Sequence, residues 1–278
     1  MPSQVLVTGH RGLVGPYVVS ELERQGYAVV GFDLADGLDV RDLDALCLSM
    51  RDCDAVIHLA AADDPSPAED IVDTILLGTK NVLDAAIVNG VKRVVLASSV
   101  DALGIFMGEA PPKYLPIDDA HPAEPHTPYG AAKRAMELLA ERTVDASDLV
   151  VICLRPPGVC DDAMMAKIRS YRSARASYEW DPIWEYGAWI HAVDLARAFV
   201  AACLCPAPVD RYACVMVAAA DVNSDLHTGP ELAALVHPTV SWRGDARYET
   251  DPRRSLIETS PAVNLLGWQP QILWTQRT

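Results

Sequence analysis

The sequence predicts a doubly wound α/β fold, in which a parallel sheet carries helices on both faces. Short β-branched runs alternate with longer amphipathic stretches through the first half of the chain. A glycine-rich turn joins the first run to the first amphipathic stretch, as is typical of such sheets. The chain has 278 residues and is 50% hydrophobic, so it can bury one large core.

The expected strands follow one another at regular intervals. They are residues 4–8, 28–32, 55–58, 93–97 and 149–153. Between them, apolar residues recur near the 3.6-residue period of a helix. These helices are expected at 13–25, 72–88 and 131–144. Further along, a helix at 193–204 is expected to return to the sheet.

Charge and composition exclude several classes of partner. Lys and Arg number 23 against 38 Asp and Glu, a net charge of −15, so neither nucleic acid nor an anionic membrane is expected as a partner. No apolar run approaches the roughly 20 residues that span a bilayer. The N-terminus lacks a signal-peptide pattern, which predicts a cytoplasmic protein. The seven cysteines show no C-x-x-C spacing and are interpreted as reduced core thiols, not as disulfides or a metal site.

Three glycines lie between the first strand and the first helix. Gly9, Gly12 and Gly15 are spaced by three residues. This spacing permits a tight turn, a close approach of backbone to a pyrophosphate, and close packing of helix on strand. The helix N-terminus adds amide donors and a partial positive charge. The pattern predicts a dinucleotide site.

Acidic residues follow the second strand and bear on the choice of cofactor. Asp33 closes that strand, where a carboxylate can accept both ribose hydroxyls and would repel a 2′-phosphate. Arg11, within the glycine turn, could instead reach a 2′-phosphate. We favour NAD and keep NADP as the alternative. Asp39 and Val40 suit an adenine pocket, with a solvated loop Asp39 as the alternative.

Candidate catalytic residues follow the fourth strand and open a later helix. Tyr129 and Lys133 are four residues apart, so both lie on one helical face. The ammonium would favour the phenolate and bring the tyrosine pKa toward that of a general base. Ser98 and Ser99 follow the strand at 93–97, at the edge where such sheets bind ligands. A hydroxyl there can hold the substrate oxygen that the tyrosine deprotonates.

In these motifs the chain resembles the extended short-chain dehydrogenases/reductases of the NAD-dependent epimerase/dehydratase family. The motifs that carry the resemblance are the turn at 8–15, Val56–Ala61, Gly78–Ala86, Ala97–Ser99, Tyr129–Lys133, Arg155–Pro156, Trp189–Ala198 and Leu266–Pro270. The resemblance implies a Rossmann-like fold. It divides the chain into a dinucleotide-binding core at 1–155 and a substrate lobe at 156–278, with elements of the lobe returning to the core.

The resemblance also implies roles for individual residues. Ser99 would polarise the substrate, Tyr129 would be the general base or acid, and Lys133 would bind the nicotinamide ribose and tune Tyr129. The expected cofactor-binding residues are Gly9, Arg11, Gly12, Leu13, Gly15, Asp33, Asp39, Val40, Leu59, Ala60, Ala61, Tyr129, Lys133 and Pro156. Helices at 72–88 and 129–143 form a dimer interface in many relatives, which implies a homodimer.

Several positions depart from family patterns. Many relatives carry Asn three residues before the Gly-Thr pair, where this chain has Ile75. Ser99 is followed by Val100 and Asp101, unlike the catalytic segments of sugar 4,6-dehydratases and uronate dehydrogenases. Elimination chemistry is therefore not favoured, although Asp101 is a candidate base. The turn at 9–15 resembles that of the NADPH-dependent GDP-fucose synthases, which keeps NADP open.

The substrate side offers weaker candidates. Arg169 and Arg172, followed by Arg175, step along one helix and could clamp a diphosphate or a carboxylate, or form a solvated stripe. Aromatic residues could stack on a sugar ring or pack in a lobe core. These are Trp180, Trp184, Tyr186 and Trp189.

Two histidines and one long segment complete the expectations. His58 and His191 are interpreted as structural residues. Residues 104–128 contain six prolines and are expected to form a surface loop over the site.

Together these features predict an NAD-dependent enzyme that oxidises or reduces a secondary alcohol or ketone on a sugar-like small molecule. An NAD-dependent epimerase of sugars or nucleotide sugars is one alternative. A non-catalytic NAD-binding regulator is another, supported by Ile75 and by Val100 and Asp101, and opposed by the presence of Ser99, Tyr129 and Lys133.

Overall fold

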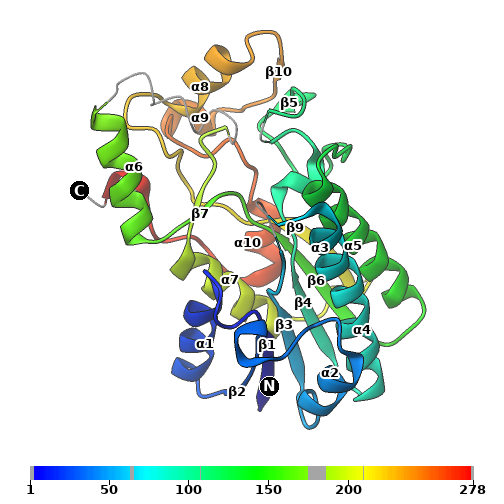
Figure 1. Cartoon of the computed structure of the whole chain (residues 1–278). Coiled ribbons are helices and arrows are strands. Elements are labelled where there is room, and N and C mark those ends of the chain that lie inside the picture. Colours follow the sequence, from blue (N-terminus) through cyan, green and yellow to red (C-terminus); the bar gives the residue numbers. More distant parts are fainter. Residues whose placement is uncertain (1–2, 63–65, 107, 175–185, 209, 277–278) are drawn as a thin grey trace.

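A six-stranded parallel sheet runs through the centre of the molecule, with helices on both faces (Figure 1). The structure is a computed structural model that describes residues 3–62, 66–106, 108–174, 186–208 and 210–276. The sheet has the order β2-β1-β3-β4-β6-β9. Its strands are β1 Gln4–Thr8, β2 Ala28–Phe32, β3 Ala55–His58, β4 Arg93–Ala97, β6 Val150–Arg155 and β9 Tyr212–Met216.

The strand order confirms the predicted doubly wound class. From β1 the chain crosses to β2 on one side, then returns to β3 on the other, so the winding reverses beside β1. The first four strands have the predicted bounds, and the fifth extends to Arg155. Strand β9 was not predicted. It pairs with β6 in parallel and closes one edge of the sheet.

Helices cover both faces of the sheet, and side chains alternate between them. On one face, Val5 and Val7 of β1 pack with helices α1 and α7. On the other, Leu6 packs with helices α2, α4 and α5. A parallel sheet with both faces covered explains why its strands are nearly continuous apolar runs. Figure 1 shows α1 and α7 apart from α4 and α5, with the strands between them.

The helices are α1 Gly15–Arg24, α2 Leu43–Ser49, α3 Ala68–Val72, α4 Gly78–Val88, α5 Pro128–Asp145, α6 Asp162–Ala174, α7 Ala192–Leu204, α8 Gly229–Val236, α9 Arg247–Thr250 and α10 Ser260–Leu266. Single 3₁₀ turns are η1 Leu34–Asp36, η3 Val100–Leu103 and η5 Trp274–Gln276. A π-helical turn, η2 Asp73–Leu77, joins α3 to α4, so the helix expected at 72–88 begins earlier and contains this turn. No helix of the described residues is long and apolar enough to cross a membrane.

A smaller lobe packs over the carboxyl ends of the strands. It contains two short parallel pairs, β5 Tyr114–Leu115 with β10 Ser241–Trp242, and β7 Val159–Cys160 with β8 Ile190–His191. The expectation of a surface loop at 104–128 was wrong for much of that segment. Phe106 and Ile117 are fully buried, because the segment supplies apolar side chains to the core of the lobe.

Asp194 of α7 ties the C-terminal segment to the core. Its side chain is buried, and its Oδ2 accepts hydrogen bonds from the amides of Gln271 and Ile272, both at 2.8 Å. Its Oδ1 pairs with Arg197 at 2.7 Å. Its carbonyl oxygen accepts from the indole of Trp268 at 3.0 Å. The Asp194 carboxylate therefore pairs with Arg197 of its own helix and accepts hydrogen bonds from two amides of the distant C-terminal segment.

Replacing Asp194 by alanine is expected to lower the free energy of unfolding by about 3 kcal/mol, because two amides and a guanidinium lose their acceptor inside the protein. Urea denaturation followed by tryptophan fluorescence measures this loss. Asp145→Ala is the control, since it removes an exposed pair with Arg142 and should cost less than about 1 kcal/mol. Equal losses in the two variants would contradict the role of Asp194.

Candidate cofactor and active site

A cleft of about 340 Å³ opens over the ends of β1, β2 and β3, where the winding of the sheet reverses. Ligands of α/β sheets bind at this position. Of the predicted cofactor-binding residues, those that line the cleft are Gly9, Arg11, Gly12, Asp33, Asp39, Val40, Leu59, Ala60 and Ala61. Those outside its lining are Leu13, Gly15, Tyr129, Lys133 and Pro156.

The turn after β1 brings backbone groups close together. Gly9 has a φ of +67°, and a Cβ there would lie 2.8 Å from the amide nitrogen of Ala60. A Cβ at Gly15 would overlap the carbonyl oxygen of Gly9. Any side chain would therefore push the turn away from β3 or from helix α1. This cradle fits the pyrophosphate of NAD, which backbone amides at a helix N-terminus can hold.

The acidic edge of the cleft is fixed by local hydrogen bonds. Asp33 accepts from the amides of Ala35 and Arg11, both at 2.9 Å. The Arg11 guanidinium pairs instead with Asp36, with Nε donating at 2.8 Å. The Nε2 of His10 lies 3.4 Å from the same carboxyl. Asp33 therefore faces the cleft while Arg11 is held by another acid, an arrangement that fits a ribose with free hydroxyls.

Val40 forms a wall of the cleft that helix α4 holds in place. A Cβ at Gly78 would lie 2.6 Å from a methyl carbon of Val40, so only glycine fits at this contact. Asn81 donates to the carbonyls of Val40 and Arg41, at 3.2 and 2.9 Å. The Asp39 carboxyl pairs with Arg41, whose hydrogen bonds lower the pKa of Asp39. Asp39 is thus an ionised, locally paired residue at the edge of the cleft.

Helix α5 begins against the loop that follows β4. Thr127 caps the helix by accepting from the amide of Gly130 at 3.1 Å. A Cβ at Gly130 would lie 2.6 Å from the carbonyl oxygen of Asp101. The glycine therefore allows the helix start, which carries Tyr129, to approach turn η3, whose first flanking residue is Ser99.

The candidate catalytic residues meet at this contact. Ser99 Oγ donates to Asp101 Oδ2 at 2.9 Å and accepts from the Asp101 amide at 3.1 Å. Burial raises the pKa of Asp101, and the hydrogen bond from Ser99 opposes this. Lys133 is buried, with Nζ donating to the carbonyl of Ala97 at 2.6 Å and lying 5.4 Å from the centre of the Tyr129 ring. A cation therefore lies beside the phenol.

His58 and His191 have structural contacts, as predicted. The His58 ring bridges the hydroxyls of Thr8 at 2.6 Å and Thr79 at 3.2 Å. Burial, with a contribution from the charge of Lys133, lowers the pKa of His58 to about 3, so this ring is neutral at ordinary pH. His191 caps helix α7 by accepting from the amide two residues ahead at 3.2 Å.

The arginines considered as a substrate clamp contact the C-terminal segment instead. Arg169 donates to the carbonyl of Trp274, and its guanidinium lies 4.8 Å from the centre of that ring. Arg172 is buried, donates to the carbonyl of Asn223, and lies 5.1 Å from the same ring. These contacts place one nitrogen of each guanidinium against the protein, and a clamp for a diphosphate or a carboxylate stays a prediction. Arg175 lies outside the described residues.

The aromatic residues of the lobe that the structure describes favour the packing interpretation. Trp189 and Tyr186 are buried. The Tyr186 hydroxyl donates to the carbonyl of Ile105 at 2.6 Å. Trp180 and Trp184 lie outside the described residues.

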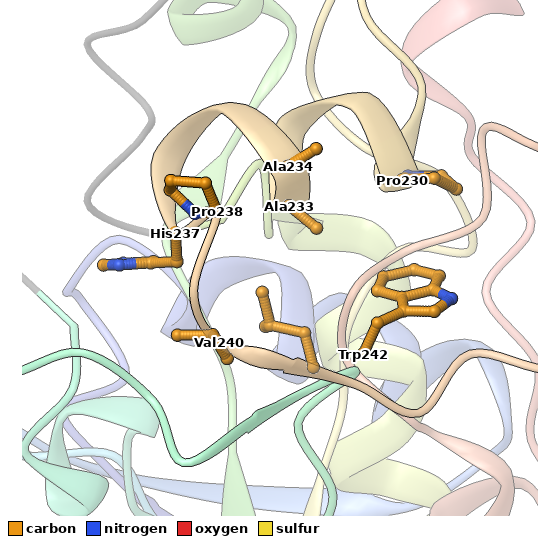
Figure 2. Close-up of a pocket in the computed structure, with 8 residues that line it drawn as sticks. Pro230, Ala233, Ala234, His237, Pro238, Val240 and Trp242 are labelled. Atoms are coloured by element: carbon orange, nitrogen blue, oxygen red, sulfur yellow. The ribbon is translucent and has the colours of Figure 1, made fainter.

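A second cavity, of about 300 Å³, lies in the lobe between α8 and β10 (Figure 2). Ala233 and Ala234 of the helix lie above Val240 and Trp242, and the His237 ring is directed away from Trp242. The lining is mostly hydrocarbon, and none of the predicted catalytic residues belongs to it. The lining residues are Leu115, Pro230, Ala233, Ala234, His237, Pro238, Val240 and Trp242.

Sequence reasoning missed several residues of the site. The further residues that line the nucleotide cleft are Phe32, Leu34, Ala35, Leu38, Arg41, Ala62 and Thr74. It also missed Glu137, which contacts Ser98 from helix α5. A signal was present, because Glu137 lies one turn after Lys133 on the same helical face.

Comparisons with known proteins agree with this geometry. Residues 5–213 match the NAD dependent epimerase/dehydratase family. A putative UDP-glucose 4-epimerase from Methanocaldococcus jannaschii is 34% identical over 46% of this chain and 47% of its own length. An L-arabinose 1-dehydrogenase (NAD(P)(+)) from Haloferax volcanii is 32% identical over 55% of this chain and 66% of its own. The chain thus spans about half the length of the first of these relatives.

Among solved structures, a short-chain dehydrogenase/reductase superfamily protein from Agrobacterium tumefaciens with bound NAD shares the fold. Its TM-score is 0.72 at 23% identity, covering 99% of this chain and 94% of that one.

A parallel sheet with a cleft over β1 to β3, and with the predicted Ser, Tyr and Lys near the end of β4, is the arrangement expected of an NAD-binding protein. The chain belongs to the NAD-dependent epimerase/dehydratase family. This confirms the predicted family, and with it NAD as the cofactor.

The hydrogen bonds of Arg11 and Asp33 predict how cofactor preference can be changed. Asp33→Ser should raise the affinity for NADP relative to NAD at least about tenfold, because the repelling carboxylate is gone and Arg11 lines the same cleft. Isothermal titration calorimetry with each nucleotide measures the ratio. Adding Arg11→Ala should abolish the gain. If the ratio of the NADP and NAD affinities is unchanged in Asp33→Ser, Asp33 has no role in the choice of cofactor.

Proposed function

We propose that the protein uses NAD to oxidise or reduce a secondary alcohol or ketone on a sugar-like small molecule. The observation that carries the proposal is that Lys133 lies beside the Tyr129 ring and donates to Ala97, two residues before Ser99 at the end of β4, on the same edge of the sheet as the cleft. The relatives that act on UDP-glucose and L-arabinose support a sugar-like substrate.

The proposed mechanism divides the work among three side chains. NAD, when bound, supplies the hydride acceptor. Tyr129 takes the proton of the substrate hydroxyl through its phenolic oxygen, and Ser99 holds the same substrate oxygen. In this direction Tyr129 acts as the phenolate, whose negative charge the ammonium of Lys133 stabilises before the proton is taken. In the direction of reduction, Tyr129 returns the proton.

Asp101 sets the resting orientation of Ser99. Its carboxylate accepts a hydrogen bond from the Ser99 hydroxyl, and its amide donates to the Ser99 oxygen. A ketone that needs a hydrogen bond from Ser99 must therefore compete with Asp101. Ile75, at the position where many relatives have Asn, is buried among apolar side chains, so no amide relay passes through it.

Tyr129→Phe is expected to lower kcat at least about a hundredfold, because the proton acceptor is removed, while NAD binding changes little. Turnover is measured across a panel of free sugars, sugar acids and nucleotide sugars. A variant that retained full turnover would disprove the role of Tyr129.

The same panel separates the dehydrogenase from the epimerase, which the Methanocaldococcus jannaschii relative favours as the second candidate. Net oxidation accumulates NADH in proportion to product. Epimerisation yields a second sugar with no accumulation of NADH. Tight NAD binding with neither outcome across the panel would favour the non-catalytic regulator.

We further propose that the protein is a cytoplasmic homodimer. All seven cysteines lie among the described residues and none is in a disulfide, which suits a reducing compartment. Apolar side chains are exposed on the helices that the family uses for dimers. Leu77 of η2 and Leu138 of α5 are 42% and 44% exposed, and Val88 of α4 is 75% exposed.

Leu138→Glu is expected to convert a dimer to a monomer, because a charge at the centre of an apolar interface is desolvated without a partner. Light scattering after size-exclusion chromatography measures the mass. Leu235→Glu on α8, another exposed leucine, is the control and should leave the mass unchanged. A monomeric wild-type protein would refute the dimer.

A further inference from the structure

Two consecutive serines at the end of β4 have separate partners. Ser98 Oγ donates to Glu137 Oε1 at 2.5 Å, and Ser99 Oγ donates to Asp101. Side chains alternate in extended backbone, so Ser98 is directed toward helix α5 and Ser99 toward the candidate active site. Ser98 and Glu137 are both buried, and neither has a role in the proposed chemistry.

Glu137 lies at the centre of a buried polar network. Arg155 Nε and Nη2 donate to its two oxygens, each at 2.7 Å. Cys214 Sγ donates to Oε1 at 3.3 Å. Burial alone would raise the pKa of Glu137, but the hydrogen bonds and charge of Arg155 hold it below its usual value. The carboxyl is therefore ionised, which makes it a strong acceptor for Ser98.

Asp119 is a second buried carboxyl that the charge of the same arginine influences. It accepts from the amide of Met216 at 2.8 Å. Burial raises the pKa of Asp119 to about 6, against the opposing charge of Arg155. Arg155 is thus influenced by two carboxyls, of which only Glu137 hydrogen-bonds to it in the described structure.

The peptide unit between Ala97 and Ser98 is held from several sides. Its carbonyl accepts the Lys133 ammonium at 2.6 Å. Its amide donates to the carbonyl of Leu154 on β6 at 2.8 Å. The side chain that follows is held by Glu137, one helical turn after Lys133. Helix α5 therefore contacts the end of β4 twice, once through a catalytic candidate and once through Glu137.

We propose that Ser98 and Glu137 are positioning residues, whose hydrogen bond sets the orientation of the 97–98 peptide and thereby the placement of Lys133 and Ser99. This inference rests on the proposed function. Without the bond, the peptide can tilt about its link to β6. The carbonyl that receives the ammonium then moves relative to Tyr129, and the Ser99 hydroxyl moves with the backbone. Small displacements of reacting groups cost large factors in rate.

Ser98→Ala tests the proposal directly, because it removes one hydroxyl and leaves the Glu137–Arg155 pair in place. We expect kcat to fall about tenfold with KM changed less than about twofold, since the lost effect is one of alignment. We also expect the titration midpoint of Tyr129 to rise by about half a pH unit or more, because its cation is less well placed. NMR of ¹³C-tyrosine protein, assigned with Tyr129→Phe, measures this without any substrate.

Cys214→Ala is the matched control. It removes a donor from the same Glu137 oxygen, but from β9 and not from β4. Its kcat and the Tyr129 titration should match those of the wild-type protein. Wild-type values in Ser98→Ala, or equal losses in Cys214→Ala, would overturn the proposal.

Glu137→Asp provides a second route should Ser98→Ala fold poorly. The shorter side chain withdraws the carboxylate from Ser98 while keeping a charge for Arg155. We expect the same change in Tyr129 titration, and no further change in that titration when both substitutions are combined, because both break the Ser98–Glu137 bond through which the effect on Tyr129 passes. Additive losses would refute the coupling. The titration of Tyr129 could shift in Ser98→Ala while the wild-type protein turns over no substrate. That result would support the positioning role and reject the proposed function.

Discussion

The ion pair between Glu137 and Arg155 joins helix α5 to strand β6 inside the protein, and candidate catalytic residues of the same helix lie close to it in the chain. Removing two charges from water costs several kcal/mol for each ion, which hydrogen bonds must offset. Arg155 supplies two of them, and Ser98 and Arg134 supply others. A buried ion pair that lost part of its hydrogen bonds would be strongly unfavourable. The pair therefore fixes the position of helix α5 relative to the sheet. Lys133 lies one turn before Glu137 on the same helix, so its position relative to the sheet is fixed as well.

The nucleotide cleft shows how an acidic chain can hold a polyphosphate. The net charge is −15, and Arg11, the cation in the glycine turn, is paired with Asp36. We therefore expect the pyrophosphate of NAD to depend on backbone amides of the turn after β1 and of helix α1. The overall charge acts on long-range encounters and on large polyanions, whereas a buried dinucleotide responds to the few groups that touch it.

The sequence was informative where local chemistry alone decides structure. The strands at 4–8, 28–32, 55–58 and 93–97 have their predicted bounds, since each is a short apolar run ended by a turn. The cleft residues around Gly9 and Asp33 follow from one motif. Other features depend on contacts between distant segments. Residues 104–128 read as a surface loop because of their prolines, and only the lobe core shows why Phe106 is buried.

Arg169 and Arg172 illustrate the same limit at the site. Their spacing predicts a basic face on a helix, which is what α6 presents. Whether that face meets a ligand or a protein segment is set by Trp274, about a hundred residues later. The hydrogen bond of Ser98 could not be predicted from nearby residues, because its partner Glu137 lies on helix α5. The bond of Asp101 with Ser99 depends on the tight turn η3 between them.

The buried carboxyl of Asp119 gives the protein a response to mild acid that no histidine in the described catalytic region provides. Burial lowers the pKa of His58 to about 3, so that ring is neutral at ordinary pH, whereas burial raises the pKa of Asp119 to about 6. A carboxyl whose pKa is raised in the folded state favours folding while it is protonated and loses that contribution as the pH rises through the folded value. The pKa shift of Asp119 is opposite in sign to that of Glu137, whose pKa is lowered in the folded protein. Acidification to pH 5 therefore relieves the cost of one buried charge next to Arg155, while Glu137 remains ionised.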